Sequence, residues 1–131
     1  MADLQDLLVD REELDRKLLA EILRPYVGID AVRQEIVPKE DWRGLNSEAK
    51  ALVFLLARRA MVAMPEVPLE VEGALPREIT AETGVKGGTL RPKLRAMARE
   101  GLLSQDSSGR YLVPTYAVLR AKKVILGGGR A

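Results

Sequence analysis

The sequence predicts a mainly α-helical fold that contains a small β-hairpin, and three observations lead to this prediction. Apolar side chains recur at helical spacing in the stretches 3–23, 46–64 and 89–100. Near the C-terminal end, two short β-prone runs flank the turn-forming residues 106–109. Hydrophobic residues make up 47% and charged residues 31% of the 131 positions, which is the balance of a globular protein with one main core.

Residues 1–45 are predicted to form an extension ahead of the main domain. The stretch 3–23 is expected to be a helix that Pro25 ends. Its apolar stripe comprises Leu4, Leu7, Leu8, Leu14, Leu18 and Ile22. Such a stripe must be buried either on the protein's own domain or on a partner, and the sequence leaves both open. The β-prone runs 26–29 and 35–37 then predict a hairpin.

The strongest helix is expected to run from Asn46 or Ser47, either of which can cap it, to about Met64. Its apolar residues fall on nearly all sides, so it should be the central helix of the core. Trp42, just before it, is expected to be a core anchor. Beyond the helix, apolar residues alternate with glutamates over 67–71, which predicts a short edge strand with an acidic face.

A short helix followed by a turn is predicted next. Pro76 suits the first helical position, and the helix should end near Thr83. Gly84 suits the left-handed residue that ends a helix, and Val85 can then turn back into the core.

A second helix is predicted over 89–100, with Thr89 as its cap. A start at Gly87 is not expected, because Pro92 would then lie inside the helix without an N–H to donate. One face of this helix is formed by Leu90, Leu94, Met97 and Ala98, and another by Arg91, Arg95 and Arg99 at four-residue intervals.

The chain is predicted to close with a hairpin at about 104–113 and a helix that Thr115 caps. The inward residues of this helix would be Ala117, Ala121, Val124 and Ile125, and the outward ones Arg120, Lys122 and Lys123. It could pair with the N-terminal helix, within one chain or across a dimer. The predicted division is an N-terminal extension (1–45), a main domain with its closing helix (46–126) and a flexible tail (127–131).

The order helix, strand, helix, helix and hairpin resembles the winged helix-turn-helix superfamily. The resemblance rests on LPREITAETGV (75–85) and LRAMAREGLL (94–103), within a region of about 46–113. These motifs point to the fold and to no narrower family. They imply a winged helix-turn-helix with an added N-terminal helix and hairpin and a C-terminal helix.

The resemblance implies a recognition helix at about 89–100 that lies in a major groove of DNA, and a wing at about 104–113. Arginine side chains suit guanine edges and phosphates alike. Arg110 would reach phosphate or the minor groove, and the backbone N–H groups of Gly87 and Gly88 would approach a phosphate. The predicted DNA-binding residues are Lys86, Gly88, Thr89, Arg91, Lys93, Arg95, Arg99 and Arg110.

The charge of the chain is distributed unevenly, which favours an anionic partner for the C-terminal part. Residues 1–74 contain 10 Lys/Arg and 15 Asp/Glu, a net of −5, whereas residues 75–131 contain 11 and 4, a net of +7. The two values sum to the overall net charge of +2. The basic part is the one that contains the predicted recognition helix.

The leading hypothesis is a DNA-binding protein, either a transcriptional regulator or a DNA-associated accessory protein. Its expected partners are double-stranded DNA and a second copy of the chain, bound through the terminal helices. The alternative is a winged-helix module that binds other proteins in a larger complex without touching DNA, because this fold serves both purposes. The acidic N-terminal half would then be the docking surface.

An enzyme is not expected. The chain has no cysteine and no histidine, which excludes thiolate nucleophiles and the commonest general base and metal ligand. No cofactor, metal or small-molecule ligand is predicted, although the apolar space between the core helix and the N-terminal hairpin could hold a small molecule. The sequence has neither a signal peptide nor a stretch that could span a membrane, so a cytoplasmic location is expected.

Overall fold

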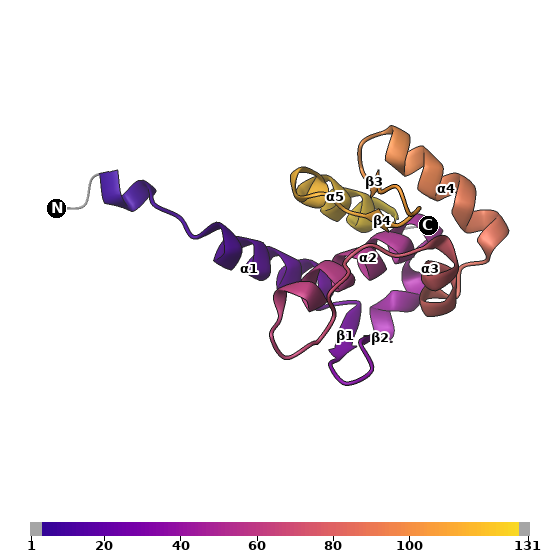
Figure 1. Ribbon diagram of the computed structural model, residues 1–131, viewed down its shortest axis with the longest axis horizontal. Coiled ribbons are helices and arrows are strands. Elements are labelled where there is room, and N and C mark those ends of the chain that lie inside the picture. Colours follow the sequence, from indigo (N-terminus) through magenta and orange to yellow (C-terminus); the bar gives the residue numbers. More distant parts are fainter. Residues whose placement is uncertain (1–3, 129–131) are drawn as a thin grey trace.

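The computed structural model describes residues 4–128 and confirms a mainly helical chain with small antiparallel hairpins (Figure 1). The helices are α1 (Arg11–Leu23), α2 (Ser47–Ala63), α3 (Pro76–Thr83), α4 (Gly87–Arg99) and α5 (Val118–Gly128). The strands are β1 (Val27–Asp30), β2 (Glu35–Pro38), β3 (Ser104–Gln105) and β4 (Tyr111–Leu112), and short 3-10 turns lie at Leu4–Leu7, Glu40–Gly44 and Thr115–Ala117. Within this described range, no helix is both long and apolar enough to cross a membrane.

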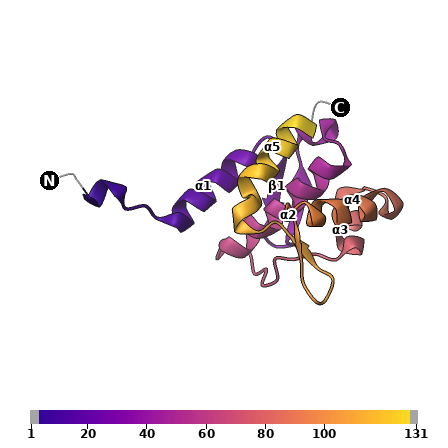
Figure 2. The same ribbon diagram turned by 90° about the horizontal axis from the view of Figure 1, so that it is seen from above.

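α2 is the central helix, as the sequence predicts. The Asn46 side chain caps it by accepting a hydrogen bond from the Ala49 N–H at 2.9 Å. Every residue from 51 to 57 is buried, so this part of the helix has no solvent-facing side. The other four helices all pack against α2 (Figures 1 and 2).

α1 is shorter than predicted, and most of the expected leucine stripe is exposed. Asp10 caps the helix by accepting a hydrogen bond from the Glu13 N–H at 3.1 Å, so the preceding residues do not continue the same helical face. The residues that α1 buries are Leu19, Ile22 and Leu23, whereas the stripe residues Leu4, Leu7, Leu8 and Leu14 are exposed. The segment ahead of α1 leads away from the body of the protein (Figures 1 and 2). A single continuous helix over 3–23 was therefore a wrong prediction, because a 3-10 turn at Leu4–Leu7 and the cap at Asp10 divide the stretch.

The first hairpin lies where the sequence predicts it. β1 and β2 pair antiparallel with Ile29 opposite Ile36. The Asp30 carboxylate accepts hydrogen bonds from two N–H groups of the turn, which fixes the turn locally. Trp42 follows the hairpin and is buried, which confirms it as a core anchor, and the Lys50 ammonium lies 5.8 Å from the ring centroid.

The edge strand predicted over 67–71 does not form. The guanidinium of Arg58, on α2, donates hydrogen bonds to the carbonyl oxygens of residues 71–73, at 2.6, 2.8 and 3.2 Å. These oxygens are therefore already satisfied without a β ladder. Only Ala74, one residue further on, forms an isolated bridge, and its partner is Tyr111 of β4.

The turn between α3 and α4 agrees closely with the prediction. Pro76 is the first residue of α3, Gly84 has a left-handed φ of 78°, and Val85 is buried. α4 differs, because it begins at Gly87 with Lys86 as its cap residue.

Pro92 consequently lies inside α4, where the sequence suggested that it would delay the start of the helix. In a regular helix the N–H of residue 92 donates to the carbonyl oxygen of Gly88, but proline has no N–H, so this oxygen loses its helical donor. Gly88 is exposed and has open space around it, so water can donate to that oxygen. Thr89 therefore lies in the first turn of α4 and is not its cap.

The second hairpin, β3–β4, pairs Ser104 with Leu112, as predicted for this region. α5 begins later than predicted, because Thr115 starts a 3-10 turn instead of capping the helix. The Thr115 hydroxyl accepts a hydrogen bond from Arg59 at 2.9 Å. α5 packs against α2, and its residues Ala121 and Ile125 are buried. Of the predicted flexible tail, Gly127 and Gly128 belong to α5, and 129–131 lie outside the described residues.

Candidate nucleic-acid interface

α4 has a buried apolar face and an exposed basic face. The buried face consists of Leu90, Leu94 and Met97, and it packs against α2 and α3. Helical spacing then directs Arg91, Arg95 and Arg99 away from this face, and all three are exposed. The apolar contacts thus fix the helix and, with it, the direction in which the three guanidinium groups point.

These arginines have no carboxylate partner in the part of the chain that the structure describes. Among residues 4–128, no Asp or Glu lies within ion-pair distance of Arg91, Arg95 or Arg99. The sequence also has no acidic residue between positions 82 and 100. Lys86, at the start of α4, is exposed and in the same described range has no such partner either. We call these four cations the α4 basic face.

The N-terminus of α4 is open to solvent. Within the described part of the chain, the N–H groups of Gly87 and Gly88 have no hydrogen-bond acceptor. A Cβ atom built on Gly88 would meet no atom within 4 Å, and one on Gly87 would meet only the Arg91 Nε, at 3.9 Å. Two free N–H groups therefore lie next to the α4 basic face, at the positive end of the helix dipole.

Lys93 differs from the four cations of the α4 basic face. Its ammonium lies 3.3 Å from a carboxylate oxygen of Glu48, in the first turn of α2. Lys93 thus joins α4 to the central helix, and its charge is already paired. Its contact with DNA stays a prediction from the sequence.

Arg110 is turned back onto its own domain. Its guanidinium lies 2.9 Å from a Glu78 carboxylate oxygen and donates to the Gly73 carbonyl oxygen at 3.2 Å. Burial raises the pKa of Glu78, but the hydrogen bond from the Leu75 N–H and the charges of Arg110 and Arg58 outweigh it and hold that pKa below its ordinary value. In this arrangement the Arg110 side chain links the hairpin to α3 and does not extend into solvent. Its position therefore does not support the expected contact with phosphate.

The tip of the hairpin is anionic. The Asp106 carboxylate accepts hydrogen bonds from the Ser108 hydroxyl, the Arg110 N–H and the Ser108 N–H, at 2.6, 3.0 and 2.9 Å. These bonds lower the pKa of Asp106, so the group is charged at neutral pH. With Arg110 paired and Asp106 at the tip, the hairpin gives no free cation to the interface.

One exposed cation near α4 was not singled out from the sequence. Arg77 lies in the first turn of α3, the helix that packs against α4, and it has no ion-pair partner among residues 4–128. Its position directly after Pro76 could have indicated it, because a residue at the start of a helix is solvent-accessible and lies near free N–H groups.

The predicted DNA-binding residues therefore fall into two groups, those that are exposed without an ion-pair partner among residues 4–128 and those that are paired within the fold. Exposed on α4 or at its start are Lys86, Gly88, Thr89, Arg91, Arg95 and Arg99, whereas Lys93 and Arg110 are held in ion pairs within the fold.

In the described range, no group of three or more acidic, histidine or cysteine side chains could hold a metal ion. Comparisons with family models, curated proteins and solved structures found no match to this chain.

Proposed function

We propose that residues 46–113 form a winged helix-turn-helix and that the chain binds double-stranded DNA through α4. The order α2, α3, α4 and β3–β4 supports the first part of the proposal. The bridge between Ala74 and Tyr111 adds support, because it lies where a third strand would join the hairpin of a wing. The corresponding role is that of a transcriptional regulator or a DNA-associated accessory protein.

The observation that carries the proposal is the α4 basic face. An exposed arginine without a carboxylate partner can form bidentate hydrogen bonds with a phosphate or with the edge of guanine. Three such arginines lie along one side of a single helix, next to the free N–H groups of Gly87 and Gly88. An α-helix of this kind fits a major groove.

Binding is expected to depend more on phosphates than on base sequence. α4 has no Asn or Gln, the residues that read adenine with two hydrogen bonds. The wing also adds no free cation, because Arg110 is paired with Glu78. The contacts that remain are those of arginine and lysine, and most of these go to the backbone of the duplex.

A winged-helix module that binds another protein is the second candidate, and the anionic hairpin tip favours it. Asp106 would be repelled by a DNA phosphate but could pair with a basic partner. The two candidates make opposite predictions for free duplex DNA, so a direct binding measurement separates them.

The test is fluorescence anisotropy of a labelled duplex of random sequence, titrated with the full chain over a salt series. Each phosphate that a cation neutralises contributes about 0.9 to the slope of log K against log salt. Contacts by the four residues of the α4 basic face predict a slope near −3.6. If Lys93 and Arg110 also left their ion pairs to bind, the slope would approach about −5.4.

An absence of binding at the lowest salt concentration would contradict the DNA proposal and favour the protein-binding module. Equal affinity for unrelated duplexes would support an accessory role. A preferred site in the genome, recovered by selection from fragmented genomic DNA, would support a regulator.

A further inference from the structure

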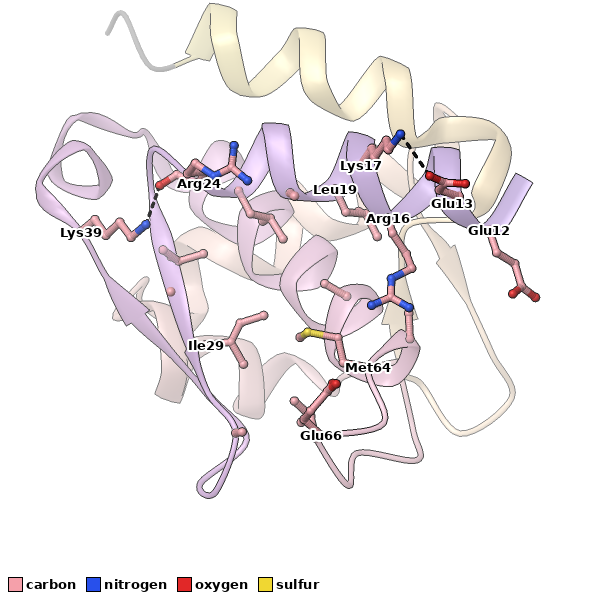
Figure 3. Close-up of a pocket in the computed structure, with 18 of the residues that line it drawn as sticks. Glu12, Glu13, Arg16, Lys17, Leu19, Arg24, Ile29, Lys39, Met64 and Glu66 are labelled. Carbon is pink, nitrogen blue, oxygen red and sulfur yellow. Dashed lines mark hydrogen bonds and ion pairs between the residues drawn. The ribbon is translucent and has the colours of Figure 1, made fainter. Parts of the chain in front are cut away.

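An open groove of about 960 Å³ lies between α1, β1 and the C-terminal end of α2 (Figure 3). Its apolar lining includes Leu19, Leu23, Val27, Ile29, Ala63 and Met64. Figure 3 shows Leu19, Ile29 and Met64 around the hollow, each from a different element. A groove of this size and character suits apolar side chains from outside the domain.

The chain also has an exposed apolar segment, residues 4–9, which we call the N-terminal arm. Leu7, Leu8 and Val9 are 73%, 79% and 65% exposed. The arm leads away from the rest of the protein in both views (Figures 1 and 2). Consecutive apolar residues with this exposure are typical of a segment that a partner covers.

We propose that the N-terminal arm of one copy binds in the groove of a second copy, so that two chains exchange arms and form a dimer. In a two-fold dimer each chain provides one arm and one groove, so a single type of contact is formed twice. This arrangement does not depend on DNA. It uses the segment ahead of α1, whereas the sequence predicts a dimer formed through the terminal helices.

The geometry at Asp10 favours a second copy over the chain's own groove. Asp10 lies at the start of α1 and lines one end of that groove. Its backbone is extended, with φ −94° and ψ 105°, and its side chain is held by the cap hydrogen bond from the Glu13 N–H. To enter its own groove the arm would have to reverse direction at this fixed residue, whereas a second copy needs no reversal.

The charges of arm and groove also agree. The arm contains Asp6 and no cation. On the groove, Arg24 is exposed without a carboxylate partner among residues 4–128, and the Lys39 ammonium donates to its carbonyl oxygen at 2.9 Å. At the opposite end of the groove, Glu12 and Glu13 lie with Arg16 and Lys17, whose charges offset theirs (Figure 3). The end with Arg24 and Lys39 therefore favours the acidic side chain of an incoming arm.

The test is analytical ultracentrifugation of the full chain over a concentration series, without DNA. An arm variant, Leu7→Ser with Leu8→Ser, removes the apolar contact. A groove variant, Ala20→Glu, places a bulky anion at an exposed helical position that lines the groove. Each should raise the dissociation constant of the dimer roughly 100-fold, as expected for central contacts of an interface.

Two matched controls change the same residue types elsewhere. Leu119→Ser with Leu126→Ser acts on exposed leucines of α5, and Ala81→Glu acts on an exposed alanine of α3. Both should leave the dimer unchanged. Circular dichroism at 25 °C should give all four variants the helical signal of the native chain, because every changed position is exposed.

Mixing gives the sharpest result. The arm variant still has an intact groove and the groove variant an intact arm, so their mixture should recover one of the two contacts and form a heterodimer. A native chain that stays monomeric would overturn the proposal, whether its arm is free or folds onto its own groove. A dimer that survives the arm variant but is lost with the α5 control would overturn it as well, and would assign the interface to α5.

Discussion

Arg58 on α2 and Arg95 on α4 have the same side chain in opposite surroundings. Arg58 is buried and donates hydrogen bonds to the carbonyl oxygens of residues 71–73. Arg95 is exposed, and no carboxylate among residues 4–128 lies within ion-pair distance of it. Each arginine directly follows an apolar residue in a helix, so the two have similar neighbours in the sequence. An arginine is therefore structural or available for a ligand according to the hydrogen-bond acceptors that the rest of the fold places around it.

Arg110 and Lys93 stand between these two extremes. Each is partly exposed and each has one carboxylate partner, Glu78 or Glu48. Ion pairs with this exposure contribute little to stability, but they fix the direction of the side chain. We therefore expect three classes of cation on this chain, and substitution should separate them.

The largest effect is expected for Arg58→Met. The substitution keeps an apolar stem but removes the donor to the carbonyl oxygens of Val71 and Glu72, whereas the oxygen of Gly73 keeps its bond from Arg110. The loss should lower the free energy of unfolding by about 2 kcal/mol or more. Urea denaturation measures this change. The matched variant Arg95→Met should shift the free energy by no more than about 0.5 kcal/mol. Equal losses for the two variants would contradict the comparison.

A smaller, pH-dependent effect is expected for Glu78→Gln, which removes the charge that holds Arg110. The pKa of Glu78 is lowered in the folded state, so its contribution is present above the ordinary value of 4.5 and is lost as pH falls through the folded pKa. At neutral pH the variant should be less stable by about 0.5–1 kcal/mol, after allowance for solvent screening. Urea denaturation at pH 7 and at pH 3 should show the difference from the native chain shrinking in acid. A difference that grows in acid would contradict this pairing.

The smallest effect is expected for Lys93→Ala. Because Lys93 is already paired with Glu48, its removal should leave the salt slope of DNA binding unchanged. Arg95→Ala should instead make that slope less steep by about 0.9, the value of one lost phosphate contact. Anisotropy titrations of the two variants, measured side by side, give this comparison directly. A loss of slope with Lys93→Ala would mean that Lys93 leaves Glu48 when DNA binds.

Much of the fold could be predicted from the sequence, because local signals determine it. Asn46 caps α2, Pro76 starts α3 and Gly84 ends it in the left-handed conformation, and each of these is a property of a few neighbouring residues. The prediction failed where a distant residue decides the backbone. The strand over 67–71 does not form, and where it would end, Arg58 of α2 donates to the carbonyl oxygens of residues 71–73.

The candidate site could be predicted only in part, for the same reason. The spacing of Arg91, Arg95 and Arg99 is enough to place them on one face of α4. Nothing in the local sequence indicates that Glu78 faces Arg110 or that Glu48 faces Lys93, since each pair is separated by tens of residues along the chain. Ion pairs between residues that are distant in the sequence depend on how the elements pack, so they can be identified only from the three-dimensional structure.

The central claim is that the α4 basic face binds duplex DNA. Its most direct test uses two double variants. The α4 variant combines Arg91→Ala and Arg95→Ala, and the control variant combines Arg33→Ala and Arg43→Ala. All four arginines are exposed and both variants lose two positive charges, so a general charge effect would act on both alike.

The measurement is the salt dependence of duplex binding by anisotropy. If the α4 basic face binds DNA, the α4 variant loses about half of the slope, from about −3.6 to about −1.8, while the control keeps the native value. Equal slopes for the two double variants would contradict it.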